Sequence, residues 1–472
     1  MIAYAFPPEG AAGVFRPLRF IRYLPNSGWR GHVIACEGYH YERYDPALLN
    51  LVPEETEAVR IPVGDSWQAF QAWRARRQTN GNCAGEHLDA ERPNLGKSRT
   101  SRRFMSEIVQ AAEARIYHPD RAMFWIRPAA KATVEMCSRK NAAVIWATAG
   151  PVSSFIVAYR ASRRTGLPYV LDFRDSWTVT YSDFEARRPQ WAIDHDRRQM
   201  YRVLKQAQAV TFRYQSEAEC YWRLYPGALD RSRIHIIPNG FESMIEHADS
   251  PLGSKCKILY AGTVSSYRYD TLLQALHALK ESSPSTVARL QLQFVGEGAQ
   301  ALAEAASSLS LSNMIIASRP IPNEDVNRLC REAHALLVLG RPTTMKGHEL
   351  MAGAKLFSYL KERKPIIGIL PDGESKNVLE SVRASTTANV DSRPEIVSVL
   401  KRVVDAWARG TLSELVPDKE KCEEYSASRQ TAALVRALEG VPAEDRFVPG
   451  AVAVPSSLQA EIMARSAVPC IV

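Results

Sequence analysis

Short apolar runs alternate along the chain with longer stretches in which apolar residues recur every three or four positions. Several short runs are apolar throughout, as parallel strands are when helices cover both faces of their sheet. The longer stretches carry the apolar stripe of an amphipathic helix. This alternation predicts an α/β protein with parallel sheets, divided into two doubly wound, Rossmann-like domains.

The expected elements follow from these patterns. We expect strands at Ile2–Phe6, His32–Cys36, Val144–Thr148, Tyr169–Phe173, Ala209–Phe212, Ile234–Ile237, Ile258–Ala261, Leu290–Val295, Met314–Ala317, Ala335–Leu339 and Pro365–Ile369. We expect helices at Phe15–Leu24, Phe155–Arg164, Asp194–Gln206, Thr271–Lys280, Asn323–Glu332 and Ala354–Lys361.

Two domains are also expected from the length of 472 residues, which exceeds what one hydrophobic core usually supports. The turn signal Asn239–Gly240 and the prolines and glycines near 251–253 end a first domain at 1–241 and precede a second at 255–415. Within 416–440, a helix near Glu423–Leu438 is expected to cross back to the first domain. A basic loop at 78–103 and the tail at 441–472 lack periodicity, and we expect the tail to be poorly ordered.

Composition is that of a globular protein, with 46% hydrophobic and 24% charged residues. The net charge of +9 favours anionic partners, or is simply a basic surface. Eight scattered cysteines without C-x-x-C argue against structural zinc and suit a reducing compartment. The opening residues lack a signal-peptide pattern, and the longest uncharged run is broken by Gly150–Pro151. We therefore expect a cytoplasmic protein, with attachment at the inner face of a membrane as an option.

Glycines and cations gather where strands end and helices begin, which is where open parallel sheets bind ligands. Gly10 and Gly13 follow the first expected strand, although they could be mere turn residues. In the second domain, the strand-end residues are Gly262, Thr263 and Gly296, and the junction cations are Arg268 and, after Gly353, Lys355. Each cation alone could be a solvated surface charge. Together with glycines that let a ligand approach, the two cations predict a diphosphate pocket.

Carboxylates stand at the end of an apolar strand of the first domain in "VLDFRDSW", which supplies Asp172, Arg174 and Asp175. They could bind the hydroxyl groups of an acceptor or assist their deprotonation. The alternative is an internal Asp–Arg pair that holds the loop. The Asp194–Asp196 pair resembles a metal-binding D-x-D, but its helical setting turns the two side chains to different faces. We interpret it as a solvated helix surface and predict no metal.

Several segments share their order and spacing with a known family. They are "FPPEGAAGVFRPLRFIRYLPNSGW", "LPYVLDFRDSW", "AQAVTFRYQSEAECY", "IHIIPNGFE", "ILYAGTVSSYR" and "GAKLFSYLKERKPIIGILP". The chain resembles the GT-B glycosyltransferases of family 4, especially the branch that acts in bacterial surface-polysaccharide assembly. The resemblance covers residues 1 to about 370 and implies two Rossmann-like domains facing across a cleft.

The resemblance implies a metal-independent, retaining hexosyltransferase. Its first domain would bind a glycan or lipid-linked acceptor through Gly10, Gly13, Arg16 and Arg174. Its second domain would bind a nucleoside-diphosphate sugar, which is a substrate, so no cofactor is implied. Arg268, Lys355, Asp175 and Asp172 are the expected catalytic residues, and the expected donor-binding residues are Gly262, Thr263, Gly296, Gly353, Glu349 and Ser358.

The family pattern transfers unevenly to this sequence. The arginine and lysine that contact the diphosphate correspond to Thr263 and Arg268, so only the second cation is kept. The paired glutamates correspond to Leu350 and Ser358, with Glu349 one place away. Phe155 stands where relatives often carry histidine.

Other functions remain open at this stage. A sugar-nucleotide epimerase has the same fold, and a catalytically silent GT-B partner protein would explain the lost glutamates. Nucleic acid is not an expected partner, because no recognition module is present. The basic loop and the run "HPDRAMFWIRP" could contact an anionic membrane or form a plain exposed surface.

Overall fold

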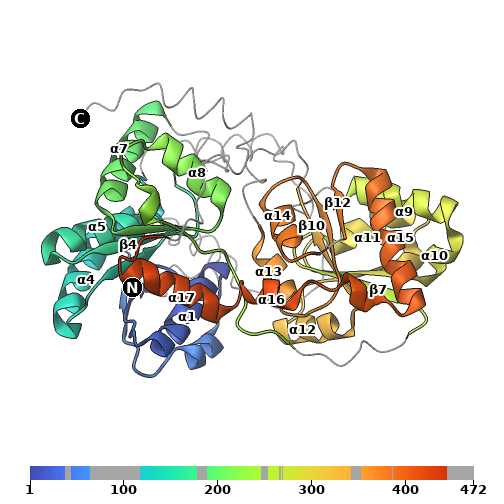
Figure 1. Ribbon diagram of the computed structural model, residues 1–472, viewed down its shortest axis with the longest axis horizontal. Coiled ribbons are helices and arrows are strands. Elements are labelled where there is room, and N and C mark those ends of the chain that lie inside the picture. The colour runs from blue at the N-terminus through green and yellow to red at the C-terminus, as the bar shows by residue number, and fades with distance from the viewer. Residues whose placement is uncertain are drawn as a thin grey trace, which may run out of the picture.

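The computed structural model describes residues 1–37, 44–63, 117–177, 189–245, 253–264, 267, 269–341, 352–384 and 386–443. They form two α/β units that lie beside each other, as the blue-to-green and yellow-to-orange halves of Figure 1 show. The basic loop at 78–103, the tail beyond 443, Arg268, Glu349 and Leu350 lie outside the described residues.

The first unit is built on parallel strands. β3 (Ile145–Thr148), β4 (Tyr169–Phe173), β5 (Ala209–Phe212) and β6 (Ile234–Ile236) pair in that order. β1 (Val33–Cys36) pairs with β2 (Ala58–Ile61), and bridges from Ile2 to Ile34 and to Ala147 join the two sets. The expected strand Ile2–Phe6 is reduced to this bridge. The chain bends after Ala3, and the prolines that follow have no amide hydrogen to continue a ladder.

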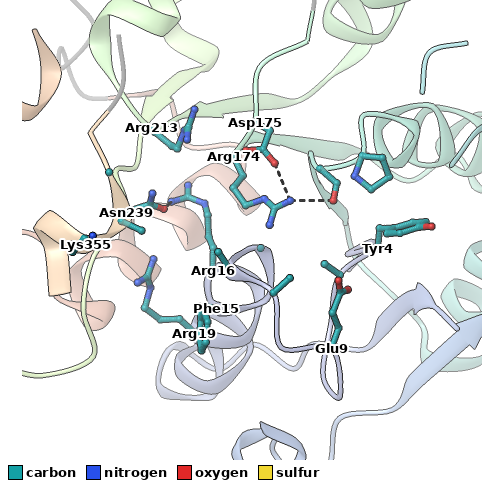
Figure 2. A pocket seen from close by; sticks show the side chains of 18 of the residues that line it. Tyr4, Glu9, Phe15, Arg16, Arg19, Arg174, Asp175, Arg213, Asn239 and Lys355 are labelled. Atoms are coloured by element: carbon teal, nitrogen blue, oxygen red, sulfur yellow. Dashed lines mark hydrogen bonds and ion pairs between the residues drawn. The ribbon is translucent and has the colours of Figure 1, made fainter. Parts of the chain in front are cut away.

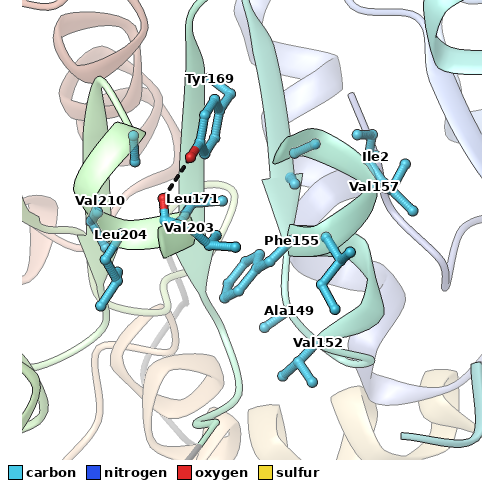
Figure 3. Packing of buried hydrophobic residues seen from close by; sticks show 14 of the residues in the cluster. Ile2, Ala149, Val152, Phe155, Val157, Tyr169, Leu171, Val203, Leu204 and Val210 are labelled. Carbon is cyan, nitrogen blue, oxygen red and sulfur yellow. Dashed lines mark hydrogen bonds between the residues drawn. The ribbon is translucent and has the colours of Figure 1, made fainter. Parts of the chain in front are cut away.

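Helices flank this sheet and enclose an aromatic core. They are α1 (Phe15–Tyr23), α4 (Ile126–Lys140), α5 (Ser153–Thr165), α7 (Gln190–Gln206) and α8 (Gln215–Leu224). Figure 3 shows Phe155 of α5 within the cluster, and its ring centroid lies 4.7 Å from that of Phe173. In the same view Tyr169 donates its hydroxyl hydrogen to the carbonyl oxygen of Val203. Phe155 is therefore a core residue that does not face the cleft.

The second unit has a six-stranded parallel sheet in the order β12-β11-β10-β7-β8-β9. The strands are β7 (Cys256–Ala261), β8 (Leu290–Val295), β9 (Ile315–Ser318), β10 (Ala335–Leu339), β11 (Ile366–Leu370) and β12 (Thr387–Asn389). Counted within the unit this is the order 6-5-4-1-2-3 of a Rossmann fold, which reverses direction between β7 and β10. Its helices are α9 (Asp270–Ser282), α10 (Pro284–Arg289), α11 (Ala299–Ser308), α12 (Asn323–Glu332), α13 (Ala354–Leu360), α14 (Glu374–Ser381) and α15 (Arg393–Arg409).

The chain returns to the first unit after α16 (Lys419–Glu423), and α17 (Ala427–Leu438) lies beside α1 in Figure 1. Leu434 and Val435 pack in one buried cluster with Phe20 and Trp146. The two segments that connect the units lie side by side, because the Phe241 nitrogen donates to the carbonyl oxygen of Tyr425 and the Ala427 nitrogen donates to that of Phe241. None of the described helices combines the length and the apolar character needed to cross a bilayer.

Candidate active site

A cavity of about 1310 Å³ lies between the two units. Its first-unit lining includes the start of α1 and the residues that follow β3, β4 and β5, and Ala352–Lys355 and Ser358 line it from the second unit. A smaller cavity of about 190 Å³ lies in the second unit, where β7, β10 and β11 end. Gly353 and Lys355 border both cavities, so the carboxyl ends of both sheets face one interdomain cleft.

Lys355, at the start of α13, holds its ammonium group over the end of β7. Its Nζ lies 4.2 Å from the ring centroid of Tyr260. A Cβ placed on Gly262 would lie only 1.7 Å from that Nζ, and Gly262 has a φ of 142°, which favours glycine. No carboxylate among the described residues pairs with Lys355. Burial lowers the pKa of Lys355 to about 8. A desolvated cation at the switch point of the sheet, without a carboxylate partner in the described ranges, is suited to bind an anionic ligand.

Some of the other expected donor-binding residues shape the turn after β7, and others line the larger cavity. Gly296 supports the turn, because a Cβ there would lie 2.2 Å from the carbonyl oxygen of Gly262. Thr263 is exposed, and its carbonyl accepts a hydrogen bond of 2.8 Å from the Tyr260 hydroxyl. Gly353 and Ser358 are exposed and line the larger cavity. A Cβ on Gly353 would meet nothing within 4 Å, so local sterics do not require glycine there.

Asp172 does not face the cleft, contrary to the sequence expectation. Its side chain is buried and accepts hydrogen bonds from Arg16 Nη2 at 2.7 Å, Thr148 Oγ1 at 2.7 Å and Thr211 Oγ1 at 2.6 Å. Burial alone would raise the pKa of Asp172, but Arg16 and the two hydroxyl groups hold it below its usual range. With its oxygens occupied inside the fold, this carboxylate is not available to an acceptor.

Arg16 is the other half of this buried pair. Although it borders the cavity, its guanidinium also donates to the carbonyl oxygens of Ile237 at 2.8 Å and Pro238 at 3.0 Å. It thereby joins α1 to β4 and to the residues that follow β6. These bonds give Arg16 a structural role, and its contact with an acceptor stays a prediction.

Arg174 and Asp175 do line the cavity (Figure 2). Arg174 Nη2 lies 2.9 Å from Asp175 Oδ2 and donates to the carbonyl oxygen of Gly150, while its Nε donates to that of Ala149. A Cβ on Gly13 or Gly150 would lie within 2 Å of this guanidinium. Gly13 thus makes room for Arg174, and Gly10 does not line the cavity. Asp175 is 54% exposed and presents a carboxylate to the cleft.

Comparison with known proteins places this architecture. No family model matches the sequence, and no curated protein matches it. Among solved structures, the lipopolysaccharide outer core galactosyltransferase WaaB aligns with a TM-score of 0.53 at 12% identity, over 93% of this chain and 98% of that one. TarM aligns at 0.56 and 8% identity over 93% and 98% of the two chains. Sucrose-phosphate synthase from Thermosynechococcus elongatus aligns at 0.54 and 13% identity over 91% and 94%.

The chain has the GT-B fold. The predicted pair of Rossmann-like domains is thereby confirmed, with the cavity in the cleft between the two domains of the fold.

Two residues of the GT-B cleft that sequence reasoning missed are arginines of the first domain. Arg19 on α1 and Arg213 directly after β5 both line the cavity, and both are buried. Arg213 could have been noticed, because it follows a buried strand as Arg174 does. Arg19 carries no such signal within its helix. Asp120, also in the lining, accepts hydrogen bonds from Ala122 N and from Ser153 N and Oγ.

The β5–α8 junction also connects the two domains. The Tyr214 hydroxyl donates to the carbonyl oxygen of Ala352 at 2.6 Å, and Ser216 donates from its backbone nitrogen and hydroxyl to Glu374. Ala352 directly precedes the segment that carries Lys355. The first domain therefore contacts the start of the segment that presents Lys355.

The Asp194–Asp196 pair is not the solvated surface that the sequence predicted. Asp196 is 1% exposed and accepts a hydrogen bond from the Trp177 indole at 3.2 Å. Asp194 accepts one from Gln190 on the helix surface. The two carboxylates point to different surroundings, and the described parts of the chain contain no group of three potential metal ligands.

Proposed function

We propose that this protein is a glycosyltransferase that moves a sugar from a nucleoside-diphosphate sugar to a glycan or lipid-linked acceptor. The observation that carries the proposal is the Lys355 ammonium over Gly262, inside the interdomain cavity of a GT-B fold and without a carboxylate partner among the described residues. Both other readings, a sugar-nucleotide epimerase and a silent partner protein, share the fold but make different predictions for turnover.

The proposed chemistry is departure of a nucleoside diphosphate. The bond between the anomeric carbon and the diphosphate oxygen breaks, and the leaving group gains negative charge as it does so. Lys355 is placed to stabilise that charge from the second domain, and a preorganised donor of this kind typically matters by about 10²–10³-fold in rate. We further propose that the enzyme belongs to family 4, retains the anomeric configuration and needs no metal.

Asp175 is our candidate for contact with the acceptor. Its exposed carboxylate lies on the first-domain side of the cleft, and Arg174 holds its orientation through the ion pair. A carboxylate so placed can accept a hydrogen bond from an attacking hydroxyl group. The acceptor class is suggested by WaaB, which is a lipopolysaccharide galactosyltransferase, and by an S. aureus TarM variant solved with α-GlcNAc-glycerol and UDP at a TM-score of 0.53.

We propose that the protein associates with the cytoplasmic face of a membrane. Exposed arginines of α4 and α5, together with exposed aromatic side chains, support this proposal, since basic and aromatic residues favour anionic lipid interfaces. The exposed residues concerned are Arg127, Arg160, Arg163, Arg164, Phe124 and Trp191. Co-sedimentation with vesicles of phosphatidylglycerol, but not of phosphatidylcholine, tests this part separately.

The central test is turnover with a panel of nucleotide-sugars and a membrane extract as the source of acceptor. Release of nucleoside diphosphate that depends on the extract and is lost in Lys355→Met supports the glycosyltransferase. Isomerisation of the sugar without an acceptor selects the epimerase. Binding of a nucleotide-sugar without any release selects the silent partner, in which Ser358 occupies a lost glutamate position. Proton NMR of the product reports retention or inversion.

A further inference from the structure

Arg19 is a buried cation without an ion-pair partner among the residues that the structure describes. Its side chain is 7% exposed, and its Nε has no hydrogen-bond partner. One nitrogen, Nη1, donates to the carbonyl oxygen of Gly240, and the guanidinium carbon lies 5.9 Å from the Phe20 ring centroid. No carboxylate within the described ranges forms an ion pair with it. By contrast Arg22, one turn further along α1, pairs with Glu242.

The surroundings of Arg19 make its charge more costly. Burial and the neighbouring Arg16 lower the pKa of Arg19 to about 10. Removing a charge of this kind from water without a partner is strongly unfavourable, and an apolar side chain of similar length would fit the fold better. The cation therefore points to a partner that arrives with a ligand, because Arg19 lines the interdomain cavity.

Arg213 has related features on the same side of the cleft. It is 5% exposed, and its Nε has no hydrogen-bond partner. Its Nη2 lies 3.6 Å from Glu217 Oε1, which also accepts a hydrogen bond from the Ser176 hydroxyl. Figure 2 shows both arginines among the lining residues, with Arg19 extending from α1 toward the side on which Lys355 lies. Three cations from two domains thus border one cavity. Lys355 and Arg19 have no carboxylate partner among the described residues, and Arg213 shares Glu217 with Ser176.

We propose that Arg19 and Arg213 form an anion-binding wall on the first-domain side of the cleft, which binds a phosphate group opposite Lys355. The planar guanidinium fork matches phosphate oxygens, and charge-assisted bonds in a buried site are strong. The phosphate belongs either to the leaving nucleoside diphosphate or to a phosphorylated acceptor. The inference rests on the proposed function for these two sources, but the wall itself can be tested by binding alone.

Isothermal titration calorimetry on the full chain provides the test. Dissociation constants are measured for UDP, GDP and ADP, and for inorganic phosphate with and without a saturating nucleoside diphosphate. The variants are Arg19→Met and Arg213→Met, with Arg22→Met as the matched control on the same helix. We expect Arg19→Met to weaken binding of one of these probes about 10-fold or more, since hydrogen bonds to charged groups contribute at that level. Arg22→Met should change binding by less than about 2-fold.

The pattern of losses identifies the source of the phosphate. Weaker binding of the nucleoside diphosphate assigns the wall to the leaving group. Unchanged nucleoside-diphosphate binding, with loss of inorganic phosphate from the saturated protein, assigns it to a second, phosphorylated substrate. If the wild type binds inorganic phosphate through Arg19 but no nucleoside diphosphate, the anion wall stands and the proposed function fails.

A purely structural role for Arg19 makes the opposite prediction. If Arg19 only holds the Gly240 carbonyl, Arg19→Met lowers the melting temperature and leaves every dissociation constant unchanged, which overturns the proposal. On the ligand-binding interpretation the melting temperature is equal to or above that of the wild type. Arg19→Lys guards against a variant that does not fold, because it keeps the charge and loses the fork. It should bind the affected probe with an affinity between those of wild type and Arg19→Met. Wild-type affinity for all probes in both Arg19→Met and Arg213→Met would refute the wall.

Discussion

The two sides of the cleft differ in how their charges are neutralised. On the first-domain side, Arg16 is paired with Asp172 and Arg174 with Asp175, and backbone carbonyl groups take up further donors of both arginines. On the second-domain side, Lys355 lies over a glycine and an aromatic ring with no carboxylate partner among the described residues. Cationic residues on the two sides therefore have different roles. The presence or absence of a carboxylate partner, and not the residue type, distinguishes these roles.

This difference separates charges that build the site from charges that await a ligand. A buried ion pair with all its donors satisfied holds elements together. Removing one partner lowers the stability of the fold, because the other charge is left buried without compensation. An unpaired cation in a cavity contributes nothing comparable to stability and is kept for another reason. Arg19 belongs with Lys355 by this criterion, although it lies on the first-domain side. Each variant below changes one member of one class.

The largest effect is expected on stability, from Asp172→Asn. The substitution leaves the Arg16 guanidinium buried without its counter-charge, which typically costs about 3–5 kcal/mol. Urea denaturation should show this loss in the free energy of unfolding. The double variant Arg16→Met/Asp172→Asn should recover part of it, because it removes the stranded charge. A loss below about 1 kcal/mol would show that the pair is not the structural element inferred here.

Lys355→Met is expected to act on turnover and not on stability. Loss of a preorganised charge should lower kcat/KM by on the order of 10²-fold. The melting temperature should not fall, since a desolvated cation without a partner is removed. Steady-state kinetics with the donor identified by the nucleotide-sugar screen measures the first expectation, and a thermal melt the second. Near-wild-type turnover would remove Lys355 from the site.

Gly262→Ala sharpens the same contrast. A Cβ at this position would lie on the Lys355 ammonium and displace it, and the φ of 142° adds strain. We expect about a 10-fold loss of kcat/KM in the wild-type background, for the loss of one charge-assisted contact. In the Lys355→Met background the same change should cost much less, because residues that act as a unit are non-additive. Equal losses in both backgrounds would indicate that Gly262 acts through the backbone alone.

The pH dependence follows from the burial of Lys355. Its folded-state pKa is lowered to about 8 from an ordinary value near 10.5, so the free enzyme loses the ammonium charge as the pH rises through 8. Above that pH, kcat/KM should fall by up to about 10-fold per pH unit. Lys355→Arg should move this limb to higher pH. For stability the sign is reversed: the charge opposes folding most below pH 8, and wild-type stability relative to Lys355→Met should rise between pH 8 and 10.5.

Much of the fold could be predicted from the sequence, because buried parallel strands are continuous apolar runs. β4, β5, β8 and β10 begin and end at the predicted residues. β2 (Ala58–Ile61) and β12 (Thr387–Asn389) were missed, since they are short, only partly buried and at the ends of their strand sets. Periodicity carries little information for such strands.

The candidate site was predictable only where local position limits the role of a residue. Gly262 and Lys355 were found because both lie at strand-to-helix junctions, and the structure brings them together. Asp172 lies near the end of β4 and Asp175 directly after it, but only the fold decides that Asp172 pairs with Arg16 and that Asp175 is exposed to solvent. Arg19 could not be told from Arg16 or Arg22, because the partners of helix residues come from distant segments.

The smallest effect is expected from Asp175→Asn, and it tests the side of the cleft that is already paired. Asp175 is 54% exposed, so its ion pair with Arg174 contributes little to stability and the melting temperature should hardly change. Asparagine keeps an oxygen that can accept a hydrogen bond from an acceptor hydroxyl, but it loses the charge that favours deprotonation. We expect a decrease in kcat/KM for the acceptor of about 10-fold or less, with the dissociation constant of the donor unchanged. Kinetics at saturating donor, together with calorimetric titration of the donor, separate the two quantities. Equal losses in donor binding and acceptor turnover would show that the Arg174–Asp175 pair shapes the cleft as a whole, and that the first-domain side acts on the donor as the second-domain side does.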